Sequence, residues 1–140
     1  MDTNLFFSSM MSMSIRRFLS VLLYLITLHS FMVGVILVFI PFRTLTHFGY
    51  QDYHGAFFKV QGGVFHIVMS IIYFMAARDP INNRILVFLI ILIKFAATLF
   101  LFSYYLFADR IWMVAASGAG DLIMGVLVLL LFLRLPKPTG

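Results

Sequence analysis

Four long apolar segments constrain this chain of 140 residues more than any other feature of its sequence. The segments run from about Phe18 to Ile40, Phe57 to Ala77, Ile85 to Phe107 and Ile111 to Leu133. A helix needs about 20 apolar residues to cross the hydrocarbon core of a bilayer. A proline follows soon after the first, second and fourth segments and ends their helices. The sequence therefore predicts an all-α integral membrane protein whose single domain is a four-helix bundle.

The links and the basic residues predict how this bundle is oriented. Short links join the second, third and fourth segments, so we expect these neighbours to form antiparallel hairpins. The basic residues near the segment ends are Arg16, Arg17, Arg78, Arg84, Arg134 and Lys137 on one side, and Arg43, Lys59 and Arg110 on the other. Basic residues accumulate on the cytoplasmic side of membrane proteins. We therefore expect an up-down-up-down bundle with both termini in the cytoplasm, preceded by a frayed or interfacial N-terminal stretch.

Composition excludes several classes of function. The chain is 63% hydrophobic and 11% charged, and it has no cysteine, which removes disulfides, thiol redox chemistry and cysteine-ligated metal centres. Its net charge of +5 comes from basic residues at the segment ends, so we expect no nucleic-acid partner. The sequence also lacks a dinucleotide fingerprint, a P-loop, a nucleophile elbow and an HExxH motif. A role without catalysis is therefore favoured.

Each segment carries one ionisable residue near the expected midplane of the membrane. These residues are His29, His66, Lys94 and Asp121. At about 1.5 Å per residue, they lie roughly 14 to 18 Å from the cytoplasmic ends of their helices. A charge at this depth is unfavourable unless it is paired or hydrated, so such residues usually face the interior of a bundle. We therefore predict that Asp121 pairs with Lys94 and that His66 lies in the same layer.

Helical spacing adds polar neighbours to three of these four residues. The resulting midplane polar cluster consists of His66, Ser70 and Tyr73 on the second segment, Lys94, Thr98 and Tyr105 on the third, and Asp121 on the fourth. Steps of three and four residues place the members from each segment on one helix face. Gly118 and Gly125 share the face of Asp121, which indicates close helix packing there. The small packing face of the first segment consists of Ser20, Thr27, Ser30 and Gly34. His29 points away from this face, so it fits the cluster less well.

The sequence allows three interpretations of this cluster. It can be structural, since a buried ion pair fixes helix partners and register. It can be a polar pocket for a ligand, a proton or a lipid headgroup. If the fourth helix begins only near Ser117, however, Asp121 lies close to a helix N-terminus and interacts with its dipole.

Two cofactor hypotheses concern the histidines. His29 and His66 lie at similar depth on neighbouring helices, as the ligands of a b-type haem would, although the direction of His29 argues against this arrangement. His47 and His54 in the first link could bind a metal together with Asp52. No third strongly placed ligand accompanies these histidines, so we expect no metal site.

The turn "RDPINNR" after the second segment has a structural explanation. Asp79 and the proline that follows favour a tight turn, and Asn82 or Asn83 can cap the third helix. Arg78 and Arg84 flank the turn, where we expect them to anchor phosphates of lipid headgroups.

The stretch "GGVFHIVMSIIYFMAARDPINNR" and the Gly120–Asp121 pair resemble small bacterial membrane proteins of the BphX-like and DoxX-like kind. The resemblance covers about residues 62 to 133 and rests on Ala76, Ala77, Arg78, Asp79, Pro80, Asn83, Arg84, Gly120 and Asp121. It implies a compact four-helix bundle in the bacterial inner membrane. Many such proteins look like accessory proteins of oxidoreductase systems, and some DoxX-like relatives are quinone-linked. His66 is not expected throughout that group.

The sequence thus favours a non-enzymatic accessory or structural subunit of an oxidoreductase or another membrane complex. Its expected partners are the lipid bilayer and either other membrane subunits or further copies of itself. Two alternatives remain. The first is a membrane redox component that binds haem b or a quinone, and the second is a small-ligand or proton-binding protein that uses the midplane polar cluster.

Overall fold

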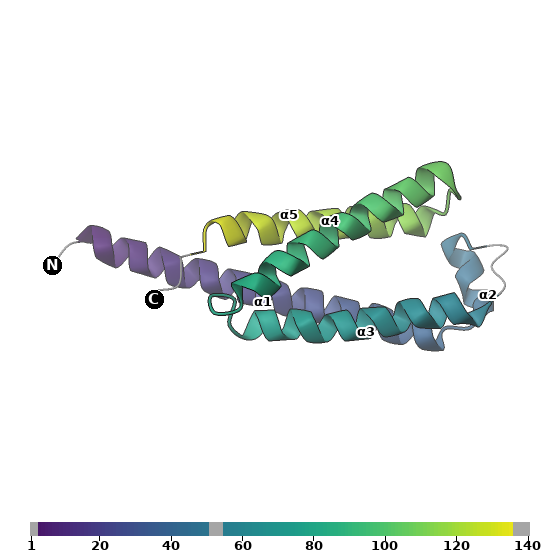
Figure 1. The fold of residues 1–140 in the computed structure, drawn as a ribbon, viewed down its shortest axis with the longest axis horizontal. Helices are drawn as coiled ribbons and strands as arrows, with labels where there is room; N and C mark the ends of the chain where they lie inside the picture. The colour runs from purple at the N-terminus through teal and green to yellow at the C-terminus, as the bar shows by residue number, and fades with distance from the viewer. Residues whose placement is uncertain (1–2, 51–54, 136–140) are drawn as a thin grey trace.

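The computed structural model describes residues 3–50 and 55–135, with side chains from Met13 onward, and this part of the chain is all helical (Figure 1). Its elements are α1 (Thr3–Phe39), α2 (Phe42–Leu45), the 3-10 helix η1 (Thr46–Phe48), α3 (Ala56–Arg78), α4 (Arg84–Phe107) and α5 (Trp112–Leu133). Four helices are long and apolar enough to cross a membrane, namely α3, α4, α5 and the part of α1 from Met13 onward. The four predicted spans are therefore present. The fourth span begins where it was predicted, since α5 starts at Trp112, and the alternative of a late start near Ser117 is excluded.

The N-terminal stretch is helical rather than frayed. α1 is continuous from Thr3 and is 37 residues long, and the alternative that this stretch lies at the membrane interface stays a prediction. The first glycine of the chain is Gly34 and the first proline is Pro41, so nothing earlier interrupts the helix. At about 1.5 Å per residue, α1 is roughly 55 Å long and exceeds the hydrocarbon thickness of a bilayer. Its first turns extend beyond the rest of the bundle (Figure 1).

α1 and α3 form the first of two tightly packed antiparallel pairs. Near the chain termini, the Ser20 hydroxyl donates to the Ala77 carbonyl at 2.6 Å. Farther from the termini, a Cβ added to Gly34 would lie 2.7 Å from the Gly63 carbonyl oxygen, and one added to Gly63 would lie 2.8 Å from the Gly34 oxygen. The two backbones therefore approach so closely that only glycine fits at either position. Such approaches are typical of helix pairs in membranes.

α4 and α5 form the second antiparallel pair. The two helices approach closely at two glycines of α5. A Cβ added to Gly118 would lie 3.3 Å from Leu101 Cβ, and one added to Gly125 would lie 3.1 Å from Lys94 Cβ. Both glycines are buried. The small residues of α5 thus let α4 lie against it along most of the span.

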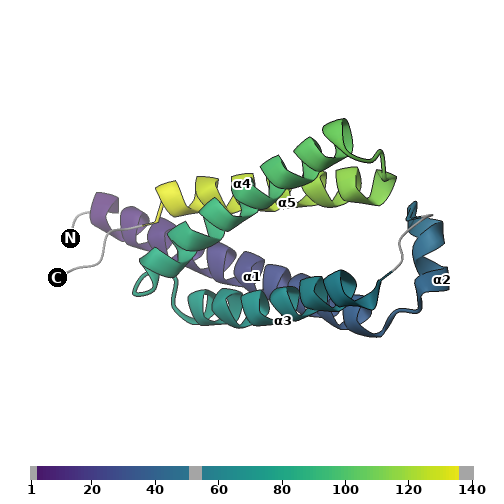
Figure 2. The same cartoon turned by 45° about the vertical axis from the view of Figure 1, so that its right-hand side comes forward.

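The two pairs meet in a core that lies at one end of the molecule, which we call the terminal end because α1 enters and α5 leaves there. The core consists of Leu19, Leu23, Ile26, Tyr73, Ala76, Ala77, Val87, Ile90, Ile91, Val128 and Leu135. These residues come from the terminal halves of all four spans. Toward α2 the pairs diverge, as the views in Figures 1 and 2 agree. The second and third spans, expected to form an antiparallel hairpin, therefore pack less closely along their length than the two pairs do.

A short helical segment crosses the opposite end, which we call the loop end. This strap consists of α2 and η1, residues 42–48. Its Phe48 ring lies 6.3 Å from the Trp112 ring at the start of α5. Gly49 follows with φ +93°, and a Cβ on it would lie 3.2 Å from Trp112 Cδ1. The strap therefore connects the α1–α3 pair to the α4–α5 pair at the end where the core is absent.

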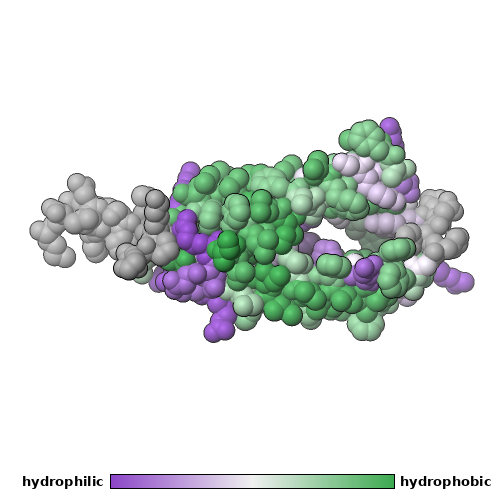
Figure 3. Space-filling view, in the orientation of Figure 1, coloured by the Kyte–Doolittle hydropathy of each residue, from purple (hydrophilic) through white to green (hydrophobic). Residues whose placement is uncertain are grey.

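The outer surface of the four spans is apolar (Figure 3). Only 17% to 28% of the residues in the most apolar window of each span are buried within the protein. Exposed leucine, isoleucine, valine and phenylalanine side chains cover the remainder. In water this surface would be strongly unfavourable. The bundle is therefore built to contact a lipid bilayer.

Candidate functional site

An ion pair between α4 and α5 forms the centre of the site. Lys94 Nζ donates to Asp121 Oδ1 at 2.5 Å, and the two side chains are only 5% and 15% exposed. The stem of the lysine passes Gly125, where a Cβ would lie 3.1 Å from Lys94 Cβ. A larger residue at that position would press the stem away from α5. Gly125 therefore gives the lysine its path to the carboxylate, and the predicted pairing of Lys94 with Asp121 is present.

Two buried side chains flank the lysine. The Tyr73 ring of α3 lies 5.4 Å from Lys94 Nζ, a distance at which an ammonium group is attracted to an aromatic face. The Thr98 hydroxyl, one turn along α4, donates to the Lys94 carbonyl at 2.8 Å and lies 3.5 Å from the Gly118 carbonyl of α5. The ammonium group is thus contacted from α5 by Asp121 and from α3 by Tyr73, while Thr98 bonds to backbone carbonyls beside it.

His66 of α3 is fixed by α1. Ser30 Oγ donates to the His66 carbonyl at 3.0 Å and lies 3.2 Å from Nδ1 of the same residue. A hydroxyl has one proton to donate. When the carbonyl receives that proton, a hydrogen bond between the hydroxyl oxygen and Nδ1 requires a proton on Nδ1. In a neutral ring, Nε2 then carries no proton and accepts hydrogen bonds. Ser30 therefore orients the imidazole and favours one tautomer.

An intramembrane cavity of about 210 Å³ brings these groups together. It is lined by Phe65, His66, Met69, Tyr73, Ile93, Lys94, Ala97, Phe100, Leu101 and Asp121, which come from α3, α4 and α5. The space-filling view shows an opening through the molecule in the region where the two helix pairs diverge (Figure 3). His66 thus shares a cavity with the ion pair, as expected for residues of one layer.

Two residues that helical spacing assigned to the cluster, Ser70 and Tyr105, are not part of this arrangement, and neither is His29, which spacing had already set apart. Ser70 is buried one turn from His66, but its hydroxyl donates within α3 to the Ile67 carbonyl at 2.6 Å. Tyr105 lies eleven residues beyond Lys94, about 16 Å along α4, so it shares the helix face but not the layer. His29 is exposed and does not line the cavity, because its neighbour Ser30 takes the position that faces His66.

The turn between α3 and α4 is organised around Asp79. Its carboxylate accepts a hydrogen bond from Asn82 Nδ2 at 2.6 Å and forms a longer ion pair with Arg16 of α1 at 3.5 Å. The hydrogen bond from Asn82, and more weakly the charge of Arg16, hold the pKa of the Asp79 carboxyl below its usual range. Arg78 is exposed beside this turn, where a phosphate could reach it.

Asn83, one of the two asparagines expected to cap the third span, bonds instead to the end of the second span. Asn83 precedes α4, but its side chain makes no cap hydrogen bond to that helix. Instead, Asn83 Nδ2 donates to the Asp79 carbonyl at 3.0 Å and to the Met75 carbonyl at 3.3 Å, so it satisfies the last carbonyls of α3. Arg84 also turns inward. It donates to the Leu135 carbonyl at 3.3 Å and lies 4.7 Å above the Phe132 ring.

Within the described residues, no group of three histidine, aspartate or glutamate side chains is arranged to hold a metal ion. Asp52 and His54 of the loop hypothesis lie outside the described residues, as does Lys137.

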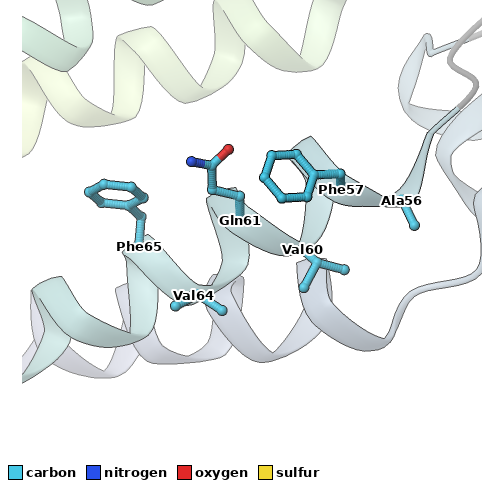
Figure 4. Close-up of a pocket in the computed structure, with 6 residues that line it drawn as sticks. All are labelled: Ala56, Phe57, Val60, Gln61, Val64 and Phe65. Atoms are coloured by element: carbon cyan, nitrogen blue, oxygen red, sulfur yellow. The ribbon is translucent and has the colours of Figure 1, made fainter.

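Two features of the site were not identified from the sequence. Ser30 was assigned to a small packing face rather than to His66, although both residues have the depth and spacing that such a contact needs. Gln61, a carboxamide in the apolar run "FFKVQGGVF", lines a second hollow on α3 with Phe65 (Figure 4). The single carboxamide of this span was the signal that could have identified it.

No protein-family model, curated protein or solved structure matches this chain. The resemblance to BphX-like and DoxX-like proteins therefore stays a prediction. What the site can do follows from its geometry, which is an internally neutralised ion pair, an oriented histidine and a tyrosine around one intramembrane cavity.

Proposed function

We propose that the protein is a non-catalytic subunit of a membrane assembly that docks onto another membrane helix through α5. The supporting observation is a face of small residues near the start of that helix. Ala116 and Ser117 are exposed, and no atom lies within 4 Å of a Cβ added to Gly120. Small residues four positions apart let two membrane helices approach closely.

Close helix approach at small residues also holds the bundle together. A face of small residues that no helix of this chain covers therefore indicates a further helix contact. Gly34 and Gly63 bring α1 to α3, and Gly118 brings α5 to α4. Ala116 and Gly120 are left over when these internal contacts have been made. They suit a helix from a second copy of this chain or from a different subunit.

The proposal includes a location and an orientation. Arg17, Arg78 and Arg134 are exposed at the terminal end, which under the positive-inside rule is the cytoplasmic end. The spans then alternate in direction, with both termini in the cytoplasm. The resemblance to BphX-like and DoxX-like proteins adds the bacterial inner membrane and an oxidoreductase system as the setting. In this role the Lys94–Asp121 pair fixes the register of α4 against α5.

A matched pair of substitutions tests the docking face. Gly120→Leu fills the open space on α5, and Ala96→Leu places the same side chain on an exposed position of α4. We expect native mass spectrometry of gently solubilised membranes to show a partner or a second copy with the wild type and Ala96→Leu. That species should be lost from Gly120→Leu, while the melting temperature of the purified chain is unchanged. A strictly monomeric wild type with a turnover of its own would contradict the proposal.

A redox subunit is the second candidate, and His66 is the observation that favours it. Its Nδ1 is held by Ser30, as the second nitrogen of a ligating histidine usually is, and its ring borders a cavity. A bis-histidine haem would also require His29, which does not line that cavity. An absorption spectrum and a solvent extract of the purified protein test this candidate. The absence of both a Soret band and a quinone would remove it.

A further inference from the structure

Two hollows that share Phe65 as a lining residue form a candidate binding space, the inner one between the helix pairs and the outer one on the surface of α3 alone. The inner part is the cavity of about 210 Å³ around the ion pair. The outer part is a groove of about 520 Å³ along α3, formed by Phe57, Val60, Val64 and their neighbours. Phe65 lines both parts. Figure 4 shows the Phe57, Gln61 and Phe65 side chains pointing from α3 toward the α4–α5 pair.

This space is accessible from the side rather than from the ends. At the terminal end the core fills the bundle, with Ile26, Tyr73 and Ile90 among its fully or nearly fully buried members. At the loop end the strap crosses from one pair to the other and contacts Trp112. Between these ends the helix pairs diverge and leave the opening seen in Figure 3. Because the surrounding helix faces are apolar, a molecule that enters between the pairs comes from the hydrocarbon region of the bilayer.

The charges of the ion pair at the polar end of the space balance each other. Lys94 is neutralised by Asp121 at 2.5 Å, and Ser30 holds Nδ1 of the neighbouring His66 ring. An anionic head would have to displace Asp121 from the lysine, and a cationic head would have to displace Lys94. An uncharged polar head needs neither. An ammonium group has three donors and a carboxylate has two oxygens, so the ion pair keeps hydrogen-bonding capacity for such a head.

The other walls favour one apolar chain. Phe57, Val60 and Val64 of the groove are hydrocarbon, and the cavity adds Met69, Ile93 and Leu101. Gln61 is the exception. Its carboxamide points toward the α4–α5 pair, about 7 Å along α3 from His66, and is available to a polar group that passes the groove (Figure 4).

We propose that this space binds a lipid-soluble molecule with a small uncharged hydroxyl-type head and a single apolar chain. The head lies against Lys94, Asp121 and His66, and the chain passes Phe65 into the groove on α3. The site goes beyond the proposed role as a subunit, because docking through α5 does not require it.

Photolabelling tests this site with two probes that differ only in the head. The first is a long-chain saturated alcohol with a diazirine in its chain, and the second is the sulfonic acid of the same chain length, which is already ionised at neutral pH. With wild-type protein in phosphatidylcholine nanodiscs, we expect the alcohol to label the peptides around Phe65 and Tyr73 about tenfold more than the acid. An unpaired charge beside the ion pair disfavours binding by at least that factor.

Asp121→Asn provides the decisive comparison. It leaves Lys94 without a counter-charge, so the preference should reverse and the acid should label about tenfold more than the alcohol. A merely structural ion pair predicts no reversal. Equal labelling by both probes in wild type and variant would overturn the proposal.

A second variant keeps the test decisive if Asp121→Asn does not fold. Phe65→Trp changes an exposed residue where the cavity meets the groove, and Phe88→Trp is the matched change on the outer face of α4. We expect Phe65→Trp to reduce alcohol labelling several-fold and Phe88→Trp to leave it unchanged. Equal labelling of the two variants, or labelling spread evenly over the outer helix faces, would show that the alcohol contacts only the annular lipid surface.

Discussion

Lys94 Nζ lies 2.5 Å from Asp121 Oδ1, between two helices that are consecutive in the chain. The lysine side chain is almost completely buried. A buried pair of this kind contributes less to stability than its short distance suggests, because both groups lose their hydration. The loss of one partner is strongly destabilising, since the remaining buried charge has no counter-ion.

Asp121→Ala should therefore destabilise the protein more than the double change Asp121→Ala with Lys94→Met. Removing one partner of a truly buried pair costs about 3–5 kcal/mol, whereas an apolar replacement of both partners is often close to neutral. Melting curves of the two variants in the same detergent measure the difference. Equal melting temperatures would mean that water reaches Lys94 and that the pair is not buried.

Neighbouring glycines of α3 should respond oppositely to alanine. A Cβ on Gly63 would lie 2.8 Å from the Gly34 carbonyl oxygen, whereas a Cβ on Gly62 meets nothing within 4 Å. Gly63→Ala should destabilise the α1–α3 pair by about 1–3 kcal/mol through overpacking. Gly62→Ala should be neutral or stabilise the helix by up to about 1 kcal/mol. Thermal unfolding followed by circular dichroism compares them, and equal effects would contradict the close crossing at Gly34.

Acidification should destabilise the bundle partly through Asp79. Its pKa is lowered in the folded protein, chiefly by the hydrogen bond from Asn82, so the folded state binds its proton less readily than the unfolded chain. The resulting stabilisation is complete above the usual carboxyl pKa of about 3.9 and is lost as the pH falls through the lower folded value. Melting temperatures measured across this acidic range should therefore fall less steeply for Asp79→Asn than for the wild type.

Arg16 supplies a control for the same measurement. Arg16→Gln removes the ion pair with Asp79 and should weaken the acid dependence slightly, whereas Arg17→Gln changes an exposed neighbour and should not alter it. An unchanged acid profile in Asp79→Asn would assign the acid sensitivity to other groups.

The single tryptophan of the chain reports on the strap. Trp112 contacts Phe48 and lies beside Gly49, which has a φ of +93°. Gly49→Ala should loosen the strap, because an alanine in this conformation costs about 1–2 kcal/mol and its Cβ presses on the indole. We expect a shift in Trp112 emission and easier quenching by acrylamide. Phe18→Ala, an exposed change on α1 near the terminal end, should leave the emission unchanged.

The spans and the ion pair could be predicted because each depends on distance along one helix. Hydropathy located the four helices, and the depth of Lys94 and Asp121 on consecutive antiparallel spans brought them together. The same reasoning wrongly placed Tyr105 in the midplane polar cluster, because residues that share a helix face can lie at different depths. It also misassigned Asn83, since an amide between two helices can serve either one and only the backbone geometry of the turn decides which.

The division into two helix pairs could not be predicted. It depends on how closely backbones approach at Gly34 and Gly63, and hence on crossing angles that hydropathy does not encode. The cavity around His66 follows from the divergence of those pairs. Its polar residues could therefore be identified from the sequence, but the space between them could not.

The position of the core at one end also determines how the molecule can deform. Each helix pair is stiffened by its own close contacts, while the two pairs are joined by the core near residues such as Leu23 and Val87 and, at the loop end, by the short strap. A small rotation about the core is magnified with distance, so the largest displacement falls on the contact between the strap and Trp112. The bundle therefore has the mechanics of a lever, and the sideways pressure of the surrounding acyl chains acts on its long arm.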